Sequence, residues 1–114
     1  MPSLCRFDPG RGAALYAEIE TKLEQLARSL RQRYRIDRII LHGSFTRREM
    51  HEGSDIDLIV VGDFPHRFHE RPSLVREMSD LPLEPLCYTP AEFAALINAG
   101  NPFITDVLSE GRDL

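Results

Sequence analysis

Several residue types and patterns are scarce in this chain, and each scarcity narrows the possible classes of protein. Tryptophan is absent, and the only cysteines, Cys5 and Cys87, lie far apart without metal-ligand spacing. The simplest interpretation is two reduced thiols in the cytoplasm rather than a disulfide. No apolar run is long enough to span a membrane, and the first residues lack the apolar segment of a secretion signal. We therefore expect a cytoplasmic protein that does not enter a membrane.

An excess of basic residues is also missing. The 14 Lys and Arg residues are outnumbered by 18 Asp and Glu residues, so the formal net charge is −4. Proteins that bind the nucleic-acid backbone without sequence preference usually present a basic surface, which makes nucleic acid an unfavoured partner. An acidic site that recruits divalent cations fits the charge balance better.

The length and the apolar pattern predict one domain, residues 1–114, large enough to bury a core without a disulfide or structural metal. Residues 1–11 contain two prolines and a glycine and are expected to form an irregular lead-in. Apolar residues at steps of three and four predict an amphipathic helix over 12–33. Three short apolar segments predict strands over 36–41, 55–61 and, more weakly, 83–88. The first two of these segments are rich in β-branched residues.

Shorter helices are expected between and after these strands. A helix over 44–49 would open directly from the first strand, and a turn would follow over 52–54. Further helices are expected over 66–79 with an interruption at Pro72, from Thr89-Pro90 to Gly100, and from Asn101-Pro102 over Phe103, Ile104, Val107 and Leu108. This order predicts an α/β (α+β) fold, with helices packed against a small mixed sheet.

Two aspartates at the start of the second strand carry the first chemical signal. Side chains alternate along a strand, so Asp55 and Asp57 point the same way while Ile56 and Leu58 point into the core. Neighbouring carboxylates on an apolar strand repel each other, and a divalent cation relieves that repulsion. Oxygen ligands of this kind suit Mg²⁺ or Mn²⁺ bound together with substrate phosphates.

Gly43-Ser44 supplies the second signal, at the end of the first strand. A glycine between a strand and a helix lets backbone N–H groups approach a phosphate closely, and Ser44 adds a hydroxyl. The direction of the aspartate motif excludes two look-alike classes. In haloacid dehalogenase phosphatases and many glycosyltransferases the Asp-x-Asp follows an apolar strand, whereas here the apolar run follows the aspartates.

The compound motif resembles that of a known family. Gly43-Ser44, then Arg47 three residues after the serine, then Ser54-Asp55-Ile56-Asp57-Leu58 is similar to the signature of minimal nucleotidyltransferase (MNT) domains in the DNA polymerase β superfamily. The resemblance extends from about residue 36 to the C-terminus and implies the polymerase β-like nucleotidyltransferase fold. One departure is Arg48, where the family usually has glycine.

The resemblance also implies a third carboxylate, on a later strand that precedes a Tyr-Thr-Pro helix start. Glu84 occupies that position, although aspartate is more usual, and Asp63 and Asp80 are the nearby acidic residues that could be mistaken for it. Pro85 removes a ladder donor beside it, which suits only an edge strand or a bulge.

By this resemblance the chain is an enzyme that transfers a nucleotidyl group from an NTP, with ATP as the expected substrate. Two Mg²⁺ ions about 3.5–4 Å apart would bind the triphosphate and activate the acceptor hydroxyl, and pyrophosphate would leave. The expected catalytic and metal-binding residues are Asp55, Asp57 and Glu84, and the expected nucleotide-binding residues are Gly43, Ser44, Arg47 and Ser54.

The chain has no room for a second domain that would hold the acceptor, so we expect the acceptor to be a separate protein. Stand-alone domains of this family are often antitoxins that add AMP to a small helical HEPN toxin, which implies a HEPN-like partner. The rival interpretation is a catalytically weak, nucleotide-binding module that acts only by binding its partner. Transfer to an aminoglycoside or to RNA is disfavoured by the short chain and the acidic balance. The sequence is also compatible with a homo-oligomer of this chain.

Other polar residues receive simpler interpretations. His42 is expected to pack near the strand end, and His66 and His69 to lie on the surface. A dense basic patch at the end of the first helix is expected to be a solvated face, although an acidic partner or RNA could dock there. It consists of Arg28, Arg31, Arg33, Arg35 and Arg38.

Overall fold

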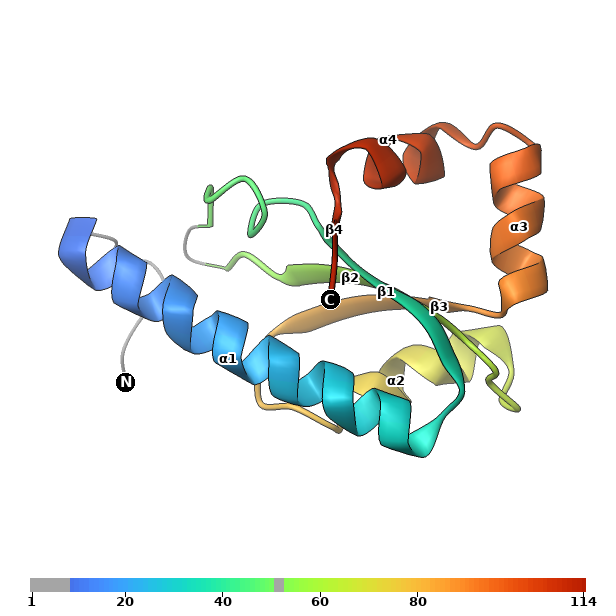
Figure 1. Cartoon of the computed structure of the whole chain (residues 1–114), viewed down its shortest axis with the longest axis horizontal. Helices are drawn as coiled ribbons and strands as arrows, with labels where there is room; N and C mark the ends of the chain where they lie inside the picture. The colour runs from blue at the N-terminus through green and yellow to red at the C-terminus, as the bar shows by residue number, and fades with distance from the viewer. Residues whose placement is uncertain (1–8, 51–52) are drawn as a thin grey trace.

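A four-stranded mixed sheet with helices on both faces forms the centre of the molecule, as the computed structural model shows for residues 9–50 and 53–114 (Figure 1). The strands are β1 (Ile36–His42), β2 (Ile56–Gly62), β3 (Leu83–Tyr88) and β4 (Arg112–Asp113). The helices are α1 (Pro9–Arg33), α2 (Arg71–Arg76), α3 (Pro90–Asn98) and α4 (Pro102–Glu110), with a 3₁₀ turn, η1 (Phe68–Glu70), before α2. The predicted α/β fold class is confirmed.

The strand order β3-β2-β1-β4 places the two most apolar strands in the middle of the sheet. β1 and β2 are antiparallel, β2 and β3 are parallel, and β4 pairs antiparallel with β1. β3 is an edge strand, which is where the sequence predicted that Pro85 would be tolerated.

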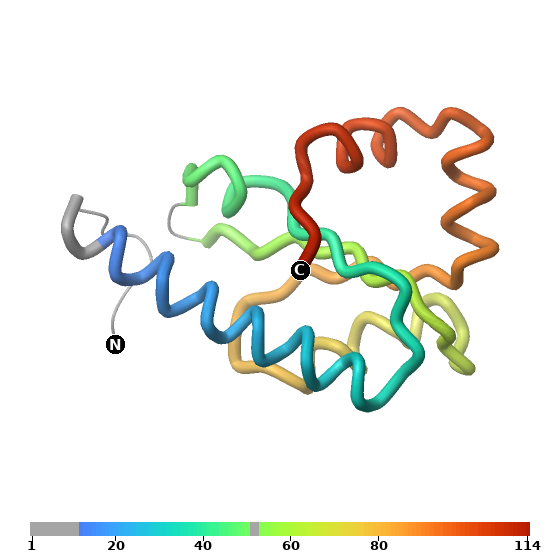
Figure 2. The backbone as a smooth tube through the Cα atoms, in the orientation of Figure 1, coloured from blue at the N-terminus to red at the C-terminus, as the bar shows by residue number. Residues whose placement is uncertain are grey.

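The central strands are buried on both faces because α1 and α2 cover one side and α3 and α4 the other. Leu58 and Val60 of β2 pack in the cluster that includes α1, whereas the alternating Ile59 and Val61 pack with residues of α3 and α4. The tube in Figure 2 shows α1 running diagonally across one face, while α3 and α4 form an angle on the other side of the sheet. Burial on both faces is the reason that four consecutive residues of β2, 58–61, are apolar instead of alternating with polar residues.

Two predicted elements are wrong in the structure. The expected irregular lead-in over 1–11 is helical from Pro9 onward, while residues 1–8 lie outside the described residues. Residues 43–48 form turns instead of the expected helix over 44–49, because Arg48 adopts a left-handed conformation with φ 57° that a helix cannot continue through.

The remaining differences concern element ends and one missed strand. The expected helix over 66–79 is reduced to η1 and α2, and β2 begins at Ile56, so Asp55 precedes the strand. Of the expected turn over 52–54, Gly53 lies in a turn and Glu52 lies outside the described residues. The short β4 was not predicted. None of the helices in the described ranges is both long and apolar enough to cross a membrane.

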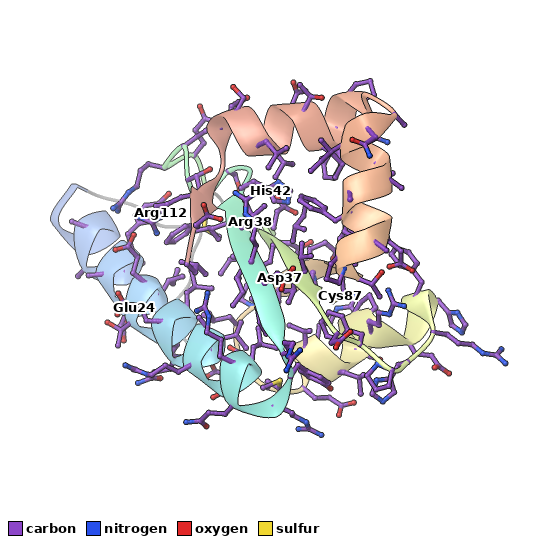
Figure 3. All side chains as sticks on the ribbon, turned by 45° about the vertical axis from the view of Figure 1, so that its right-hand side comes forward. Glu24, Asp37, Arg38, His42, Cys87 and Arg112 are labelled. Carbon is purple, nitrogen blue, oxygen red and sulfur yellow. The ribbon has the colours of Figure 1, made fainter. Side chains whose placement is uncertain are left out.

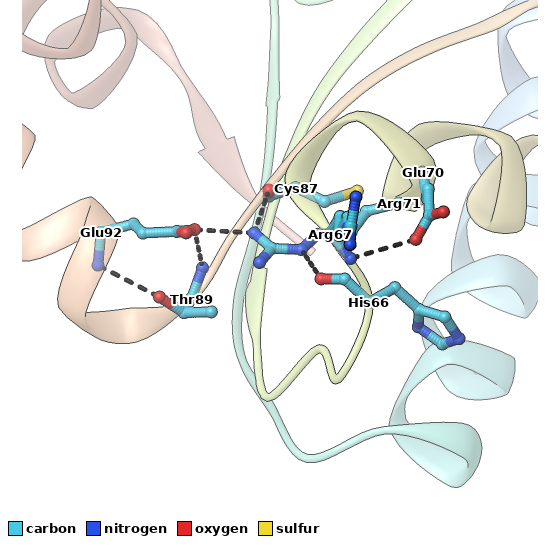
Figure 4. Close-up of polar contacts among 7 residues, drawn as sticks. All are labelled: His66, Arg67, Glu70, Arg71, Cys87, Thr89 and Glu92. Atoms are coloured by element: carbon cyan, nitrogen blue, oxygen red, sulfur yellow. Dashed lines mark hydrogen bonds and ion pairs between the residues drawn. The ribbon is translucent and has the colours of Figure 1, made fainter.

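A buried arginine joins three elements on the side of the sheet near β3 (Figure 4). Arg71 donates hydrogen bonds to the carbonyl oxygens of His66 and Cys87, and its guanidinium pairs with Glu92 at 2.7 Å. Glu92 also accepts from the backbone N–H of Thr89, in the predicted cap of α3. Burial raises the pKa of the Cys87 thiol to about 12, so this free thiol stays protonated in the core, whereas Cys5 lies outside the described residues.

Candidate active site

Three polar side chains form a row across one end of the sheet. His42 at the end of β1 is paired in register with Asp57 of β2, and Asp57 is paired with Glu84 of β3. All three share the face that carries α3 and α4, since Asp57 alternates with the buried Ile56 and Leu58. Figure 3 shows His42 at the end of the sheet beneath α4. The sheet itself therefore brings the two predicted carboxylates, Asp57 and Glu84, side by side.

Gly43 lies directly against Asp57. Its backbone has φ 79°, and a Cβ built at this position would overlap Oδ2 of Asp57. Both the left-handed conformation and the lack of space therefore require glycine here. The lack of a side chain at Gly43 lets the chain turn away from the sheet directly beside the Asp57 carboxylate.

The turns after Gly43 are held against α1. The Tyr16 hydroxyl accepts a hydrogen bond from the backbone N–H of Met50 at 3.2 Å, and the Tyr16 ring packs against Phe45 with centroids 5.1 Å apart. The Arg48 guanidinium lies 4.3 Å from the centre of the Tyr16 ring. Arg47, on the other side of the turn, is exposed and pairs with Glu49 at 2.8 Å.

A cavity of about 520 Å³ lies over the row of polar residues. One wall is polar and contains Gly43, Arg47, Asp57 and Glu84. The opposite wall comes mainly from α4, with Phe103, Asp106, Val107 and Glu110, while His42 and Leu86 complete the lining. A cavity of this size is in the range that accepts a small-molecule ligand of the size of a nucleotide.

The electrostatics of the row are unfavourable for the carboxylates alone. Burial raises the pKa of the Asp57 carboxyl, and the negative charges of Asp55 and Glu84 raise it further, against the opposing influence of His42 and Arg47. Burial likewise lowers the pKa of His42, whose Nε2 is buried with no hydrogen-bond partner among the described residues. A bound cation would favour the ionised form of Asp57.

The donor set suits a hard divalent cation that shares its coordination with a substrate. No three His, Cys, Asp or Glu side chains in the described part of the chain are arranged to hold a metal ion by themselves. Mg²⁺ is commonly bound by one or two carboxylates plus phosphate oxygens and waters, and Asp57 with Asp55 or Glu84 provides that number. Because the cavity holds four carboxylates and one arginine, a triphosphate would need cations to enter it.

The next question is which of the other predicted residues line the cavity and where the alternatives to Glu84 lie. Within the described residues, Ser44, Ser54 and Asp55 do not contribute to its lining, although the charge of Asp55 reaches Asp57. The possible substitutes for Glu84 are elsewhere: Asp80 pairs with Lys22 at 3.0 Å, and Asp63 is exposed at the other end of β2. Glu84 itself is 55% exposed and lies 3.9 Å from Arg76.

Sequence reasoning missed the contribution of α4. Phe103, Asp106 and Glu110 line the cavity, but their sequence offered only an apolar pattern with no catalytic spacing.

The histidines outside the row behave as expected, since His66 and His69 are exposed. In the basic patch, Arg31 donates to the backbone oxygen of Leu114 at 2.8 Å and Arg38 pairs with Asp113 at 3.2 Å.

Comparisons with known proteins agree with this geometry. The family model "Polymerase beta, Nucleotidyltransferase" matches residues 24–114, which include the whole sheet and every residue of the cavity. A comparison with curated proteins gives no match. Among solved structures, the fold is similar to that of a Sulfolobus solfataricus protein assigned as a nucleotidyltransferase and solved at 1.40 Å. The TM-score is 0.59 at 13% identity, over 74% of this chain and 78% of the other. The chain therefore belongs to the polymerase β-type nucleotidyltransferase family.

Proposed function

We propose that this domain transfers a nucleoside monophosphate, AMP, from ATP to a hydroxyl group of a partner protein. The observation that carries the proposal is the row in which Asp57 and Glu84 are register neighbours, with Gly43 and Arg47 beside them around one cavity. Carboxylates on one side and phosphate-binding groups on the other form the arrangement that phosphoryl transfer needs.

Each of these residues has a distinct role in the proposal. Asp55, Asp57 and Glu84 would hold Mg²⁺, and the bound ion would supply positive charge for the triphosphate and for the acceptor oxygen. Gly43, Ser44 and Ser54 face the phosphates with backbone N–H and hydroxyl groups, and Arg47 exchanges its pairing with Glu49 for a phosphate oxygen. The acceptor oxygen forms a bond to the α-phosphorus, the bond to the β-phosphate breaks, the hydroxyl proton leaves to solvent, and pyrophosphate is released.

Exposed apolar side chains support a protein as the acceptor. Ile97 of α3 and Leu108 of α4 are 44% and 37% exposed, on the two helices that flank the cavity. A partner that covers these two side chains would remove their apolar surface from water, and a helical protein of the HEPN type is the partner we propose. In that pairing the domain acts as an antitoxin.

The exposure of Glu84 favours a second candidate. Because Glu84 is 55% exposed and lies near Arg76, the third carboxylate is less firmly placed than Asp57. A domain without a competent third carboxylate would bind nucleotide and neutralise its partner by occupying its surface, without transfer.

The test is a labelling experiment with purified protein, Mg²⁺ and a lysate of the source cells. Labelled ATP is added with the label on either the α- or the γ-phosphate, and the Asp57→Asn variant serves as control. Nucleotidyl transfer predicts one discrete protein band labelled from α-ATP only and absent with the variant. Capture of the partner without any label would replace the proposal with the binding module.

A further inference from the structure

The cavity has three apolar side chains, Leu86 of β3 and Phe103 and Val107 of α4, in a lining that is otherwise largely charged. The α4 wall also carries the carboxylates of Asp106 and Glu110, whereas Gly43 and Arg47 follow the end of β1. A nucleoside triphosphate has charged phosphates at one end and a flat, weakly polar base at the other. If the phosphates lie at Gly43 and Arg47, the apolar side chains are the part of the lining that suits the base.

Phe103 is the most exposed large apolar side chain of α4. The neighbouring Ile104 and Val107 are 1% and 3% exposed and pack against the sheet, whereas Phe103 is 44% exposed although it is the largest apolar side chain of the helix. Leaving a phenyl ring open to water forgoes the favourable burial that its neighbours obtain. The ring lies at the cavity, so a ligand in the cavity would cover it.

His42 fixes the position of this ring. The two rings meet edge to face, with centroids 5.6 Å apart and planes at 76°. Such a contact supports the Phe103 ring from one side, at the end of the strand that leads into Gly43. The ring is thus connected to the phosphate side of the cavity through adjacent residues of the chain, His42 and Gly43.

We propose that Phe103 is the stacking platform for the nucleotide base, and that it makes the site prefer purines over pyrimidines. The proposal rests on the proposed function, because it assigns the base end of the same nucleotide. Stacking on an aromatic ring depends on the overlapping area, so a purine gains more than a pyrimidine. His42 is a positioning residue that holds the platform.

The experiment measures dissociation constants by calorimetry for Mg²⁺-ATP, Mg²⁺-CTP and inorganic tripolyphosphate with Mg²⁺. The proteins are the wild type, Phe103→Ala, Phe103→Tyr and Phe68→Ala. Phe68 is a matched control because it is also a 44% exposed phenylalanine, outside the cavity lining. Thermal melting of each variant establishes that it is folded.

We expect Phe103→Ala to weaken ATP binding about tenfold, to leave tripolyphosphate binding unchanged, and to reduce the preference for ATP over CTP. Phe68→Ala should bind all three ligands as the wild type does, whereas Phe103→Tyr, which keeps an aromatic ring, should retain the preference for ATP over CTP that Phe103→Ala reduces. Equal affinity of wild type and Phe103→Ala for ATP, or an equal loss for ATP and tripolyphosphate, overturns the platform while the nucleotide site stands. If the wild type binds neither ATP nor tripolyphosphate, the proposed function itself fails.

Discussion

At the scale of single residues, the site depends on how closely Asp57 approaches the backbone of Gly43. Gly43→Ala would place a methyl group on Oδ2 of Asp57 and force an alanine into φ 79°. We expect a loss of about 2–4 kcal/mol of unfolding free energy, from overpacking and left-handed strain together, with loss of nucleotide binding. Chemical denaturation measures the stability and calorimetry the binding.

The matched control is Gly100→Ala. Gly100 has φ 69°, but no atom lies within 4 Å of the position of an added Cβ. This variant should lose only about 1–2 kcal/mol, from the backbone conformation alone, and should bind nucleotide normally. Equal losses for the two variants would mean that the contact with Asp57 is unimportant.

The second residue-scale prediction concerns the charge of Asp57. Burial raises its pKa in the folded state above the unfolded value, so the folded protein binds this proton more tightly. Its contribution to stability is therefore favourable at low pH and is lost as the pH rises through the folded pKa. At pH 7 without divalent cations, Asp57→Asn should melt a few degrees above the wild type, and the difference should vanish below about pH 4.

Melting in the presence of Mg²⁺ and ATP distinguishes metal binding by Asp57 from the mere burial of its charge. Added Mg²⁺ with ATP should raise the melting temperature of the wild type and not that of Asp57→Asn, since ligand binding stabilises only the form that binds. A variant that melts below the wild type at pH 7, or gains equally from Mg²⁺-ATP, would contradict this account of Asp57.

The positions of Asp57 and Glu84 were easier to predict from the sequence than the α4 wall of the cavity. Alternation along a strand placed Asp57 on one face, and the resemblance placed Glu84 on the next strand, where the two are indeed in register. The place of Phe103 in the cavity could not be predicted from the sequence, because Phe103, Ile104, Val107 and Leu108 form one apolar helical pattern. Only the packing of α4 decides that Ile104 is buried and Phe103 open.

At the scale of elements, the turns over 43–50 are the least regular part of the site. Strands β1 to β3 were predicted because buried strands have a strong apolar signal, and α3 because Thr89 and Glu92 form a capping box. The expected helix over 44–49 failed at Arg48, which has a left-handed backbone (φ 57°) and whose side chain lies against the Tyr16 ring. β4 is two charged residues, Arg112 and Asp113, which have no strand signal of their own.

The conformation of Arg48 leads to a prediction for this element. Arg48→Gly and Arg48→Ala both remove the contact with the Tyr16 ring, but only glycine adopts φ 57° without strain. We expect the glycine variant to be more stable than the alanine variant by about 1 kcal/mol in chemical denaturation. Alanine equal to or better than glycine would show that the turn relaxes out of the left-handed conformation.

At the scale of the whole molecule, the sheet carries the row of His42, Asp57 and Glu84, and the helices lie on its two faces. α1 lies on the face opposite the cavity and holds the turns after Gly43 through Tyr16. α3 and α4 lie on the cavity side, where α4 supplies the second wall. The family match begins at residue 24, so the contact between Tyr16 and Met50 involves a part of α1 beyond the matched region.

The measurement that tests the central claim most directly is the rate of nucleotidyl transfer by Glu84→Gln. Wild type, Glu84→Gln and Asp80→Asn are compared with α-labelled ATP, Mg²⁺ and the same acceptor, after calorimetry has shown that each binds ATP. If the row Asp57–Glu84 performs the chemistry, Glu84→Gln should lose at least about a hundredfold in rate while Asp80→Asn transfers normally. Transfer by Glu84→Gln at the wild-type rate would contradict the account.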